Sequence, residues 1–237
     1  MTASTSLSVI VPVWNEAGRL EATLAAVAQF MAAHSLHGEV VLVDDGSTDG
    51  TPELARRLGA RVLAHPENRG TGAAVRTGML AAKGDFRLFC DADLSTPMEE
   101  ALRLVGALER GAAVAVGSRM IEGAEVLRAR QRRRAVLSVG FNRLTGALVP
   151  GVRDTQCGFK MFTAEAANLC FRRARIDRYA FDVELLVIAH VLGLPVEEVP
   201  IRWSEADSSR VDLIRDGARM LADLARVGLL RSRGAYR

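Results

Sequence analysis

Residues 39–51 read EVVLVDDGSTDGT, an apolar run that ends in two carboxylates and a turn rich in Gly, Ser and Thr. The apolar part predicts a strand that is covered on both faces, as strands in parallel sheets are. Similar short apolar runs recur along the first two thirds of the chain, and stretches with helical spacing separate them. This alternation predicts an α/β fold with a mostly parallel sheet.

The apolar runs and the helical spacings give the expected elements. The strand candidates are Leu7–Val13, Glu39–Val43, Arg61–Ala64, Phe86–Cys90, Ala113–Gly117 and Val196–Ile201. The helix candidates are Glu16–Ala33, Pro97–Glu109, Phe181–Val191 and Leu213–Leu230. Because no stretch is rich enough in Gly, Pro and Ser to mark a boundary, residues 1–237 are expected to form one domain.

Composition narrows the class of protein. Of the 237 residues, 49% are hydrophobic, which is enough for a sizeable core without disulfides or metal staples. The three cysteines are odd in number and widely spaced, so we expect a reducing cytoplasm rather than a secreted disulfide framework. No signal peptide or membrane-spanning run is evident, so any membrane contact is expected to be peripheral, on the cytoplasmic face.

Asp91 and Asp93 follow the strand candidate that ends at Cys90. Carboxyl ends of parallel strands form the ligand crevice of open α/β sheets. Two carboxylates close together there repel each other, and Mg²⁺ or Mn²⁺ would offset that repulsion while binding phosphate oxygens. The alternative is a helix cap or a solvated turn.

Two further strand ends carry polar residues. Asp45 could accept hydrogen bonds from a base or ribose, while Ser47, Thr48 and Asp49 could cap the helix that follows. Residues 14–16, Trp-Asn-Glu, are either a helix cap or a wall and acceptor for a nucleobase. The three strand ends together favour a nucleoside diphosphate site.

Seven segments, in order and spacing, resemble glycosyltransferase family two, and the longer ones resemble its dolichyl-phosphate β-glucosyltransferase branch. They are VIVPVWNE (9–16), VLVDDGSTDGT (41–51), ENRGTGAAVRTGM (67–79), DADLSTP (91–97), GSRM (117–120), RDTQCGFKMF (153–162) and YAFDVELL (179–186). The resemblance extends from Leu7 to about Ile201. It implies the GT-A fold, a nucleotide-sugar donor, a divalent metal and inversion at the anomeric carbon.

The resemblance also implies roles for particular residues. The residues expected to form the nucleotide pocket are Pro12, Trp14, Glu16, Val43, Asp45, Arg69 and Gly70. Asp91, Ala92 and Asp93 are expected to hold diphosphate and metal, and Arg119 to face phosphate. Ser95 stands where some relatives supply another metal ligand, which leaves its role open.

Asp154, like Asp93, is a candidate catalytic residue. A sugar hydroxyl acceptor needs a general base, whereas a lipid phosphate is already a nucleophile at neutral pH. With a phosphate acceptor, Asp154 is therefore expected to position substrate rather than remove a proton. Asp182 could contact the sugar or pair with an arginine such as Arg178, and Lys160 could hold phosphate or be a solvated strand residue. Cys157 is expected to be a packing residue.

The prediction of the acceptor depends on a stretch of basic residues. Residues 119–143 hold seven arginines against two glutamates, within a chain of net charge +3. Arg128, Arg132, Arg133 and Arg134 precede apolar residues up to Leu148, so the segment at about 120–150 could meet a lipid phosphate and anionic headgroups. The helix at about 210–231 could form a second such surface. Both could instead be core-packed helices with a charged face.

The donor sugar and the acceptor stay open at this level. The resemblance to the dolichyl-phosphate β-glucosyltransferase branch makes UDP-glucose the expected donor and a polyprenyl-type phosphate the expected acceptor. A soluble or glycan acceptor with Asp154 as base, and a silent nucleotide-sugar-binding scaffold, are the alternatives. Nucleic acid is not expected, because the basic run has no aromatic interleaving. The sequence leaves the oligomeric state open.

Overall fold

The computed structural model describes residues 5–128, 145–146, 148–204 and 215–237. In chain order it contains β1 (Leu7–Val13), α1 (Ala17–Ala33), β2 (Gly38–Asp44), α2 (Thr51–Arg57), β3 (Arg61–Ala64), α3 (Thr71–Ala81), β4 (Phe86–Cys90), the 3₁₀ turn η1 (Met98–Glu100), α4 (Ala101–Glu109), β5 (Val114–Ser118) and β6 (Glu125–Arg128). The later elements are β7 (Phe159–Thr163), α6 (Ala164–Arg173), α7 (Phe181–Val191), β8 (Val196–Pro200), β9 (Arg202–Ser204) and α8 (Arg215–Ser232).

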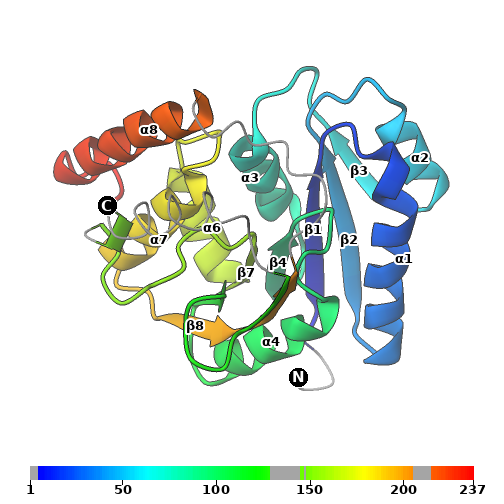
Figure 1. The fold of residues 1–237 in the computed structure, drawn as a ribbon, viewed down its shortest axis with the longest axis horizontal. Helices are drawn as coiled ribbons and strands as arrows, with labels where there is room; N and C mark the ends of the chain where they lie inside the picture. Colours follow the sequence, from blue (N-terminus) through cyan, green and yellow to red (C-terminus); the bar gives the residue numbers. More distant parts are fainter. Residues whose placement is uncertain (1–4, 129–144, 147, 205–214) are drawn as a thin grey trace.

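A seven-stranded sheet forms the centre of the molecule, in the order β3-β2-β1-β4-β7-β5-β8 (Figure 1). Strand β7 runs antiparallel to both neighbours, and the other pairs are parallel. A second, two-stranded sheet pairs β6 with β9. The predicted α/β architecture with a mostly parallel sheet is confirmed.

Two hydrophobic cores lie on opposite faces of the sheet. One joins the inner faces of α1 and α4 to alternate strand residues such as Val9 and Val11. The other joins α3, α6, α7 and the inner face of α8 to the intervening residues, such as Ile10 and Val41. The period-two alternation of strand side chains produces this division. Within the described ranges, no helix is long and apolar enough to cross a membrane.

The predicted element boundaries agree closely with the structure. Strands β1, β3 and β4 and helix α7 have the predicted bounds, and the other predicted strands differ by one residue at one or both ends. The helix expected from Pro97 begins as the turn η1, and the last helix is described from Arg215 onward, so its predicted start at Leu213 lies outside the described residues. Strands β6, β7 and β9 and helix α6 were not predicted from the sequence, and β7 carries residues next to the site.

Candidate active site at the carboxyl edge of the sheet

Hydrogen bonds to side chains join the loop after β1 to the loop after β2. The amide of Asn15 donates to Ser47 Oγ at 2.8 Å, and Thr48 N donates to Asn15 Oδ1 at 2.8 Å. Glu16 N donates to Thr51 Oγ1 at 3.0 Å. Asn15 has a positive φ of 55°, a conformation that asparagine tolerates better than most residues. The Ser/Thr-rich turn thus holds the neighbouring loop. Of the three residues expected to cap the following helix, Asp49 accepts from the amide of Thr51 at 3.1 Å, and it also accepts from Ala17 N of α1 at 3.2 Å.

Asp45 is buried, and the loop before α3 surrounds its carboxylate. Oδ1 accepts from His65 Nδ1 at 2.7 Å and from Arg69 N at 3.1 Å, and Oδ2 accepts from Gly70 N at 2.7 Å. A carboxylate has about four acceptor positions, so Oδ2 keeps room for one more donor. His65, which the sequence analysis did not name, therefore fixes the orientation of the carboxylate that was expected to meet the nucleotide.

The preceding residue, Asp44, faces the other side of the sheet. Its Oδ2 accepts from Ser47 N at 3.2 Å, while Oδ1 is buried and has no hydrogen-bond partner among the described residues. A buried acceptor without a donor is costly, so such an atom is expected to meet water or a ligand.

The remaining nucleotide-pocket candidates divide into exposed and buried groups. Trp14, directly after β1, is 43% exposed. Pro12 is half-buried, and Glu16 forms an ion pair with Arg19 at 2.8 Å. Val43 is fully buried and faces α3, where it lies against Gly78. The expectation that Val43 lines the pocket is wrong for its side chain, because strand alternation turns it into the core.

Asp91 and Asp93 lie close enough for mutual repulsion, as the metal hypothesis requires. Asp91 is accessible to solvent, and its carboxylate accepts no hydrogen bond from a described residue. Asp93 Oδ1 accepts from Ser95 N at 2.9 Å. Although the residue is accessible to solvent, partial desolvation of its carboxylate by the surrounding protein, then the charges of Asp93 and Asp182, raise the pKa of Asp91 to about 7, against the opposing effect of Lys160 and Arg119. This uncompensated negative charge suits a divalent cation.

Within the described residues, no group of three or more metal-ligating side chains occurs. Two carboxylates with diphosphate and water completing the shell are the usual arrangement for Mg²⁺, so the residues fit such an ion. Ala92, between them, is buried, and its carbonyl accepts from Thr23 Oγ1 at 2.6 Å. That bond anchors the turn to α1, so Ala92 positions the carboxylates.

Arg119 and Asp154 form a bidentate pair beside the two aspartates. Arg119 Nε donates to Asp154 Oδ2 at 2.7 Å, Nη2 donates to Oδ1 at 2.8 Å, and Arg119 N donates to Oδ2 at 3.0 Å. Trp203 lies beneath the guanidinium, whose Cζ is 5.3 Å from the ring centroid. Glu198 on β8 accepts the amides of Arg153 and Asp154, at 2.8 and 2.9 Å, and so fixes the turn.

The catalytic role expected for Asp154 needs correction. Its side chain is fully buried, so it does not present a surface to a substrate. Burial opposes the charged form, but the hydrogen bonds and charge of Arg119 prevail and hold the pKa of Asp154 below its usual range. A carboxylate that is sequestered and held ionised is a poor general base. Asp154 instead orients Arg119, whose pKa rises despite its burial.

Lys160 and Asp182 pair with each other. Lys160 is fully buried on β7, and its ammonium donates to the Asp182 carboxylate and to Cys157 O. The interpretations of Lys160 as a phosphate ligand or a solvated residue are both wrong. Asp182 is paired, as one alternative held, but with Lys160 rather than Arg178. Cys157 is buried, and burial first of all raises the pKa of its thiol to about 12, which fits a packing residue.

Arg69 and Gly70 lie beside Asp45, to which their amides donate, and their place in a nucleotide pocket stays a prediction. Gly70 has a φ of 114°, and a Cβ there would overlap with Asp177 O and the Arg178 side chain. The residue must therefore be glycine for the loop after β3 to pass under the 176–178 segment. Arg69 is exposed at the same loop.

The acceptor residues fall mostly outside the described part of the chain. Arg132, Arg133 and Arg134 lie outside it, and only the backbone of Arg128 is described, as the last residue of β6. Helix α8 is described from residue 215 onward. Leu224 and Val227 pack into the core, whereas Leu221 and Leu229 are 53% and 47% exposed. That α8 presents an amphipathic outer surface to a membrane therefore stays a prediction. Its exposed leucines agree with that prediction.

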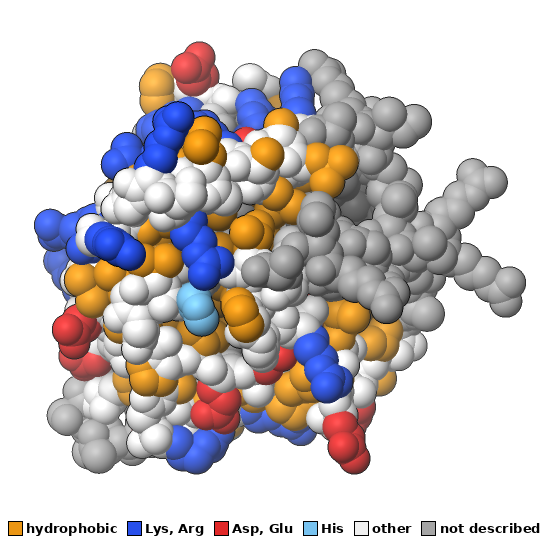
Figure 2. Space-filling model, turned by 90° about the vertical axis from the view of Figure 1, so that its left-hand side faces the viewer, with side chains coloured by type: hydrophobic (Ala, Val, Ile, Leu, Met, Phe, Trp, Pro, Cys, Tyr) orange, Lys and Arg blue, Asp and Glu red, His pale blue; other side chains and the backbone are white. Residues whose placement is uncertain are grey.

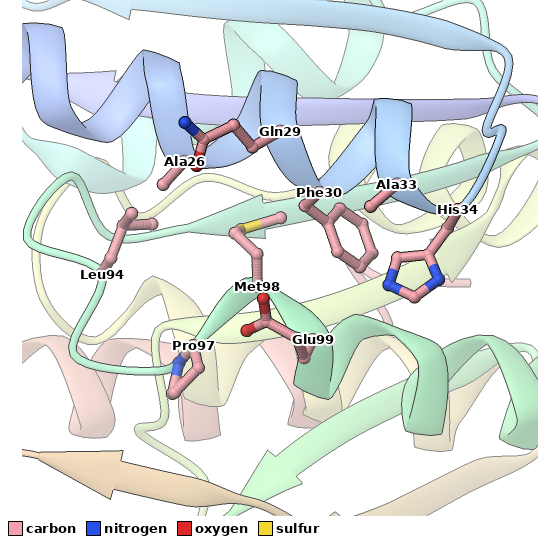
Figure 3. A pocket seen from close by; sticks show the side chains of 9 residues that line it. All are labelled: Ala26, Gln29, Phe30, Ala33, His34, Leu94, Pro97, Met98 and Glu99. Carbon is pink, nitrogen blue, oxygen red and sulfur yellow. The ribbon is translucent and has the colours of Figure 1, made fainter.

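A separate hollow of about 270 Å³ lies between α1 and residues 94–99 (Figure 3). Phe30, His34, Met98 and Glu99 are among the side chains around it. None of the candidate site residues lines this hollow, so it is distinct from the carboxylate site.

Comparison with known proteins agrees with this geometry. The glycosyl transferase family 2 model matches residues 8–170. A dolichyl-phosphate β-glucosyltransferase of Drosophila melanogaster is 39% identical over 99% of this chain and 78% of its own length. The human dolichyl-phosphate β-glucosyltransferase is 35% identical over 98% of this chain and 77% of its own length.

Solved structures show the same fold. Mannosyl-3-phosphoglycerate synthase from Rubrobacter xylanophilus superposes with a TM-score of 0.74 at 19% identity, over 97% of this chain and 75% of its own. Glucosyl-3-phosphoglycerate synthase from Mycobacterium tuberculosis, solved with Mn²⁺ and UDP-glucose, superposes with a TM-score of 0.68 at 24% identity, over 97% and 79%. The fold is therefore GT-A, as predicted. The chain belongs to glycosyl transferase family 2.

Proposed function

We propose that this enzyme transfers glucose from UDP-glucose to a polyprenyl-type lipid phosphate, with inversion at the anomeric carbon. The observation that carries the choice of a phosphate acceptor is the Arg119–Asp154 pair, because it removes the expected base from the site. An ionised phosphate needs no base to attack. The dolichyl-phosphate β-glucosyltransferases among the relatives support the same acceptor class.

The donor would lie across the ends of β1, β2 and β4. Trp14 offers an exposed ring to the base, and the free position on Asp45 Oδ2 suits a base N–H. Glucosyl-3-phosphoglycerate synthase, which has this fold, was solved with UDP-glucose and Mn²⁺. Uracil and glucose are the proposed base and sugar on this support.

The reaction would be a single displacement. A phosphate oxygen of the acceptor attacks the anomeric carbon from the face opposite UDP, and a new C–O bond forms. The bond from that carbon to the β-phosphate oxygen breaks, and its electron pair leaves with UDP, so no proton is transferred. A divalent cation held by Asp91 and Asp93 would neutralise charge on the departing diphosphate.

Arg119 would complete the electrostatic environment. Its guanidinium is held by Asp154 on one side and by Trp203 beneath, so its orientation is fixed before substrate binds. Its charge lies within electrostatic reach of Asp91. Preorganised charge of this kind stabilises a transition state without reorganisation at the moment of reaction.

The lipid acceptor implies contact with a membrane surface, and we place the enzyme peripherally on its cytoplasmic face. Figure 2 shows basic and hydrophobic side chains interspersed on the side of the molecule that carries α8 and the C-terminus. Arg219, Arg226 and Arg233 are exposed on or just after α8, near the exposed Leu221 and Leu229. Basic residues beside apolar ones suit an anionic headgroup layer.

A donor and acceptor matrix tests the proposal. Purified enzyme is incubated with radiolabelled UDP-glucose or GDP-mannose, with Mn²⁺ or EDTA, and with a polyprenyl phosphate in detergent or 3-phosphoglycerate in buffer. We expect label in the lipid phase only with UDP-glucose, Mn²⁺ and the polyprenyl phosphate. Transfer to 3-phosphoglycerate alone would refute the lipid acceptor, and metal-dependent binding of UDP-glucose without transfer to either would favour a silent scaffold.

A further inference from the structure

Lys160 and Asp182 form a buried ion pair that the proposed reaction does not use. The Lys160 side chain is 0% exposed and that of Asp182 is 9% exposed. Besides Asp182, the ammonium binds Cys157 O at 2.6 Å and lies 5.6 Å from the centroid of the Phe89 ring. Lys160 is thus fully enclosed by protein and cannot touch a substrate.

Such a pair needs an explanation other than stability. Removing two charges from water is expensive, and replacing a buried ion pair by apolar residues of similar size is often neutral or stabilising. Phe89 and Phe162, on the same face of the sheet as Lys160, are buried and aromatic, and Asp91 and Asp154 are further charges within electrostatic reach of the ammonium. Packing of this core alone therefore does not call for a lysine.

The pair connects three elements directly below the carboxylate site. Lys160 lies on β7, opposite Phe89 of β4, which is two residues before Asp91. Asp182 lies in the first turn of α7. Through Cys157 O, the ammonium also holds the turn that precedes β7. Lys160 thus links this turn to β4 and α7, beside a long hydrogen bond that Gln156 Nε2 donates to Tyr179 O at 3.4 Å.

That turn is in contact with Asp91. Gly158 follows Cys157, and a Cβ built at Gly158 would overlap with the carboxylate of Asp91. Asp91 itself accepts no hydrogen bond from a described residue, so its side chain is located by packing rather than by a donor. A shift of the turn by a few tenths of an ångström would therefore move the Asp91 carboxylate.

We infer that the Lys160–Asp182 pair is a positioning device that fixes the 157–158 turn against Asp91 and thereby sets the affinity of the site for a metal-bound nucleoside diphosphate. The inference rests on the proposed function, for which it names two positioning residues. Groups that orient a metal ligand from behind commonly change metal affinity by about 10- to 100-fold when they are mutated.

The test separates position from stability by removing both charges together. Single variants Lys160→Met and Asp182→Leu each leave an unpaired buried charge and are expected to unfold at lower temperature. The double variant leaves none, and we expect it to unfold within a few degrees of the wild type. Calorimetry then measures the Kd of UDP with Mn²⁺ and with EDTA, without acceptor or turnover.

We expect the double variant to bind UDP with Mn²⁺ at least tenfold more weakly than the wild type and to bind UDP equally in EDTA. The matched control is Arg110→Met with Glu197→Leu, which removes a surface ion pair between α4 and β8 and should leave both Kd values unchanged. Wild-type affinity in the double variant would overturn the inference, as would a double variant less stable than either single one. Absence of Mn²⁺-dependent binding by the wild type would instead contradict the proposed function.

Discussion

Replacing Asp154 by Asn should destabilise the protein strongly, because it leaves Arg119 charged in a buried position. The side chains are 11% exposed for Arg119 and 0% for Asp154, so solvent screens the pair little. In the variant, an NH₂ group replaces one of the two carboxylate oxygens. Because that group donates rather than accepts, the bidentate pair with the guanidinium cannot form.

The magnitude follows from the burial of the pair. Breaking a buried ion pair by removing one partner costs about 3–5 kcal/mol in stability. At the lower limit, about 3 kcal/mol lowers the unfolding temperature of a domain of this size by roughly 6–12 °C. The surface pair Arg110–Glu197, with side chains 63% and 39% exposed, provides the control, and Glu197→Gln should cost less than about 1 kcal/mol.

The effect should also depend on pH in a defined direction. The pKa of Asp154 is lower in the folded protein than its usual value, so its contribution to stability is fully present above the unfolded pKa. The contribution is lost as pH falls through the folded pKa. The stability difference between wild type and Asp154→Asn should therefore be constant near neutral pH and shrink below about pH 4.

Thermal unfolding followed by circular dichroism, at neutral pH and in steps below pH 5, is measured for the wild type and the two variants. An Asp154→Asn protein that unfolds within two degrees of the wild type at neutral pH would refute the account of the Arg119–Asp154 pair. A stability difference between wild type and Asp154→Asn that grows as the pH falls would contradict the predicted direction of the pH dependence.

Three further predictions concern the site. Asp93→Asn should abolish Mn²⁺-dependent glucosyl transfer while leaving the circular dichroism spectrum unchanged, and retained transfer would contradict the metal assignment. Gly158→Ala should displace the Asp91 carboxylate and lower kcat at least tenfold, whereas Gly18→Ala, at an open position in α1, should preserve kcat; equal rates would show that the turn yields freely. Changing the arginines at 132, 133 and 134 to Gln should raise the KM for lipid acceptor and leave donor hydrolysis unaltered, so equal losses in both assays would argue against an acceptor role.

The sequence predicted the parallel strands well because each is a short apolar run with a polar end. Strand β7 was missed because Lys160 interrupts its apolar pattern. The residue is tolerated there because Asp182, distant in sequence, supplies the counter-charge. A single sequence does not reveal such a long-range pairing. The local pattern therefore predicted neither the antiparallel strand β7 between β4 and β5 nor the pairing of Lys160 with Asp182.

The site was predicted at the level of segments but not always of side chains. Val43 and Asp45 were assigned to one pocket, yet Val43 is in the core and Asp45 is enclosed by the following loop. His65 could have been found, since it is the first residue after β3 and strand ends carry the ligand crevice. The enclosure of Asp154 by Arg119 could not, because it depends on two turns meeting in space.

The reversed direction of β7 has a consequence for how such enzymes can diversify. Because β7 starts at the edge where β4 and β5 end, the chain leaves β5 and returns to β7 on the same side of the sheet. The chain between β6 and Arg153 can therefore change in length without threading through the sheet, provided that Arg119, Asp154 and the 157–158 turn keep their places. If this segment meets the acceptor, as proposed, its exchange is a route to new acceptors that leaves the loops at the ends of β1, β2 and β4 intact.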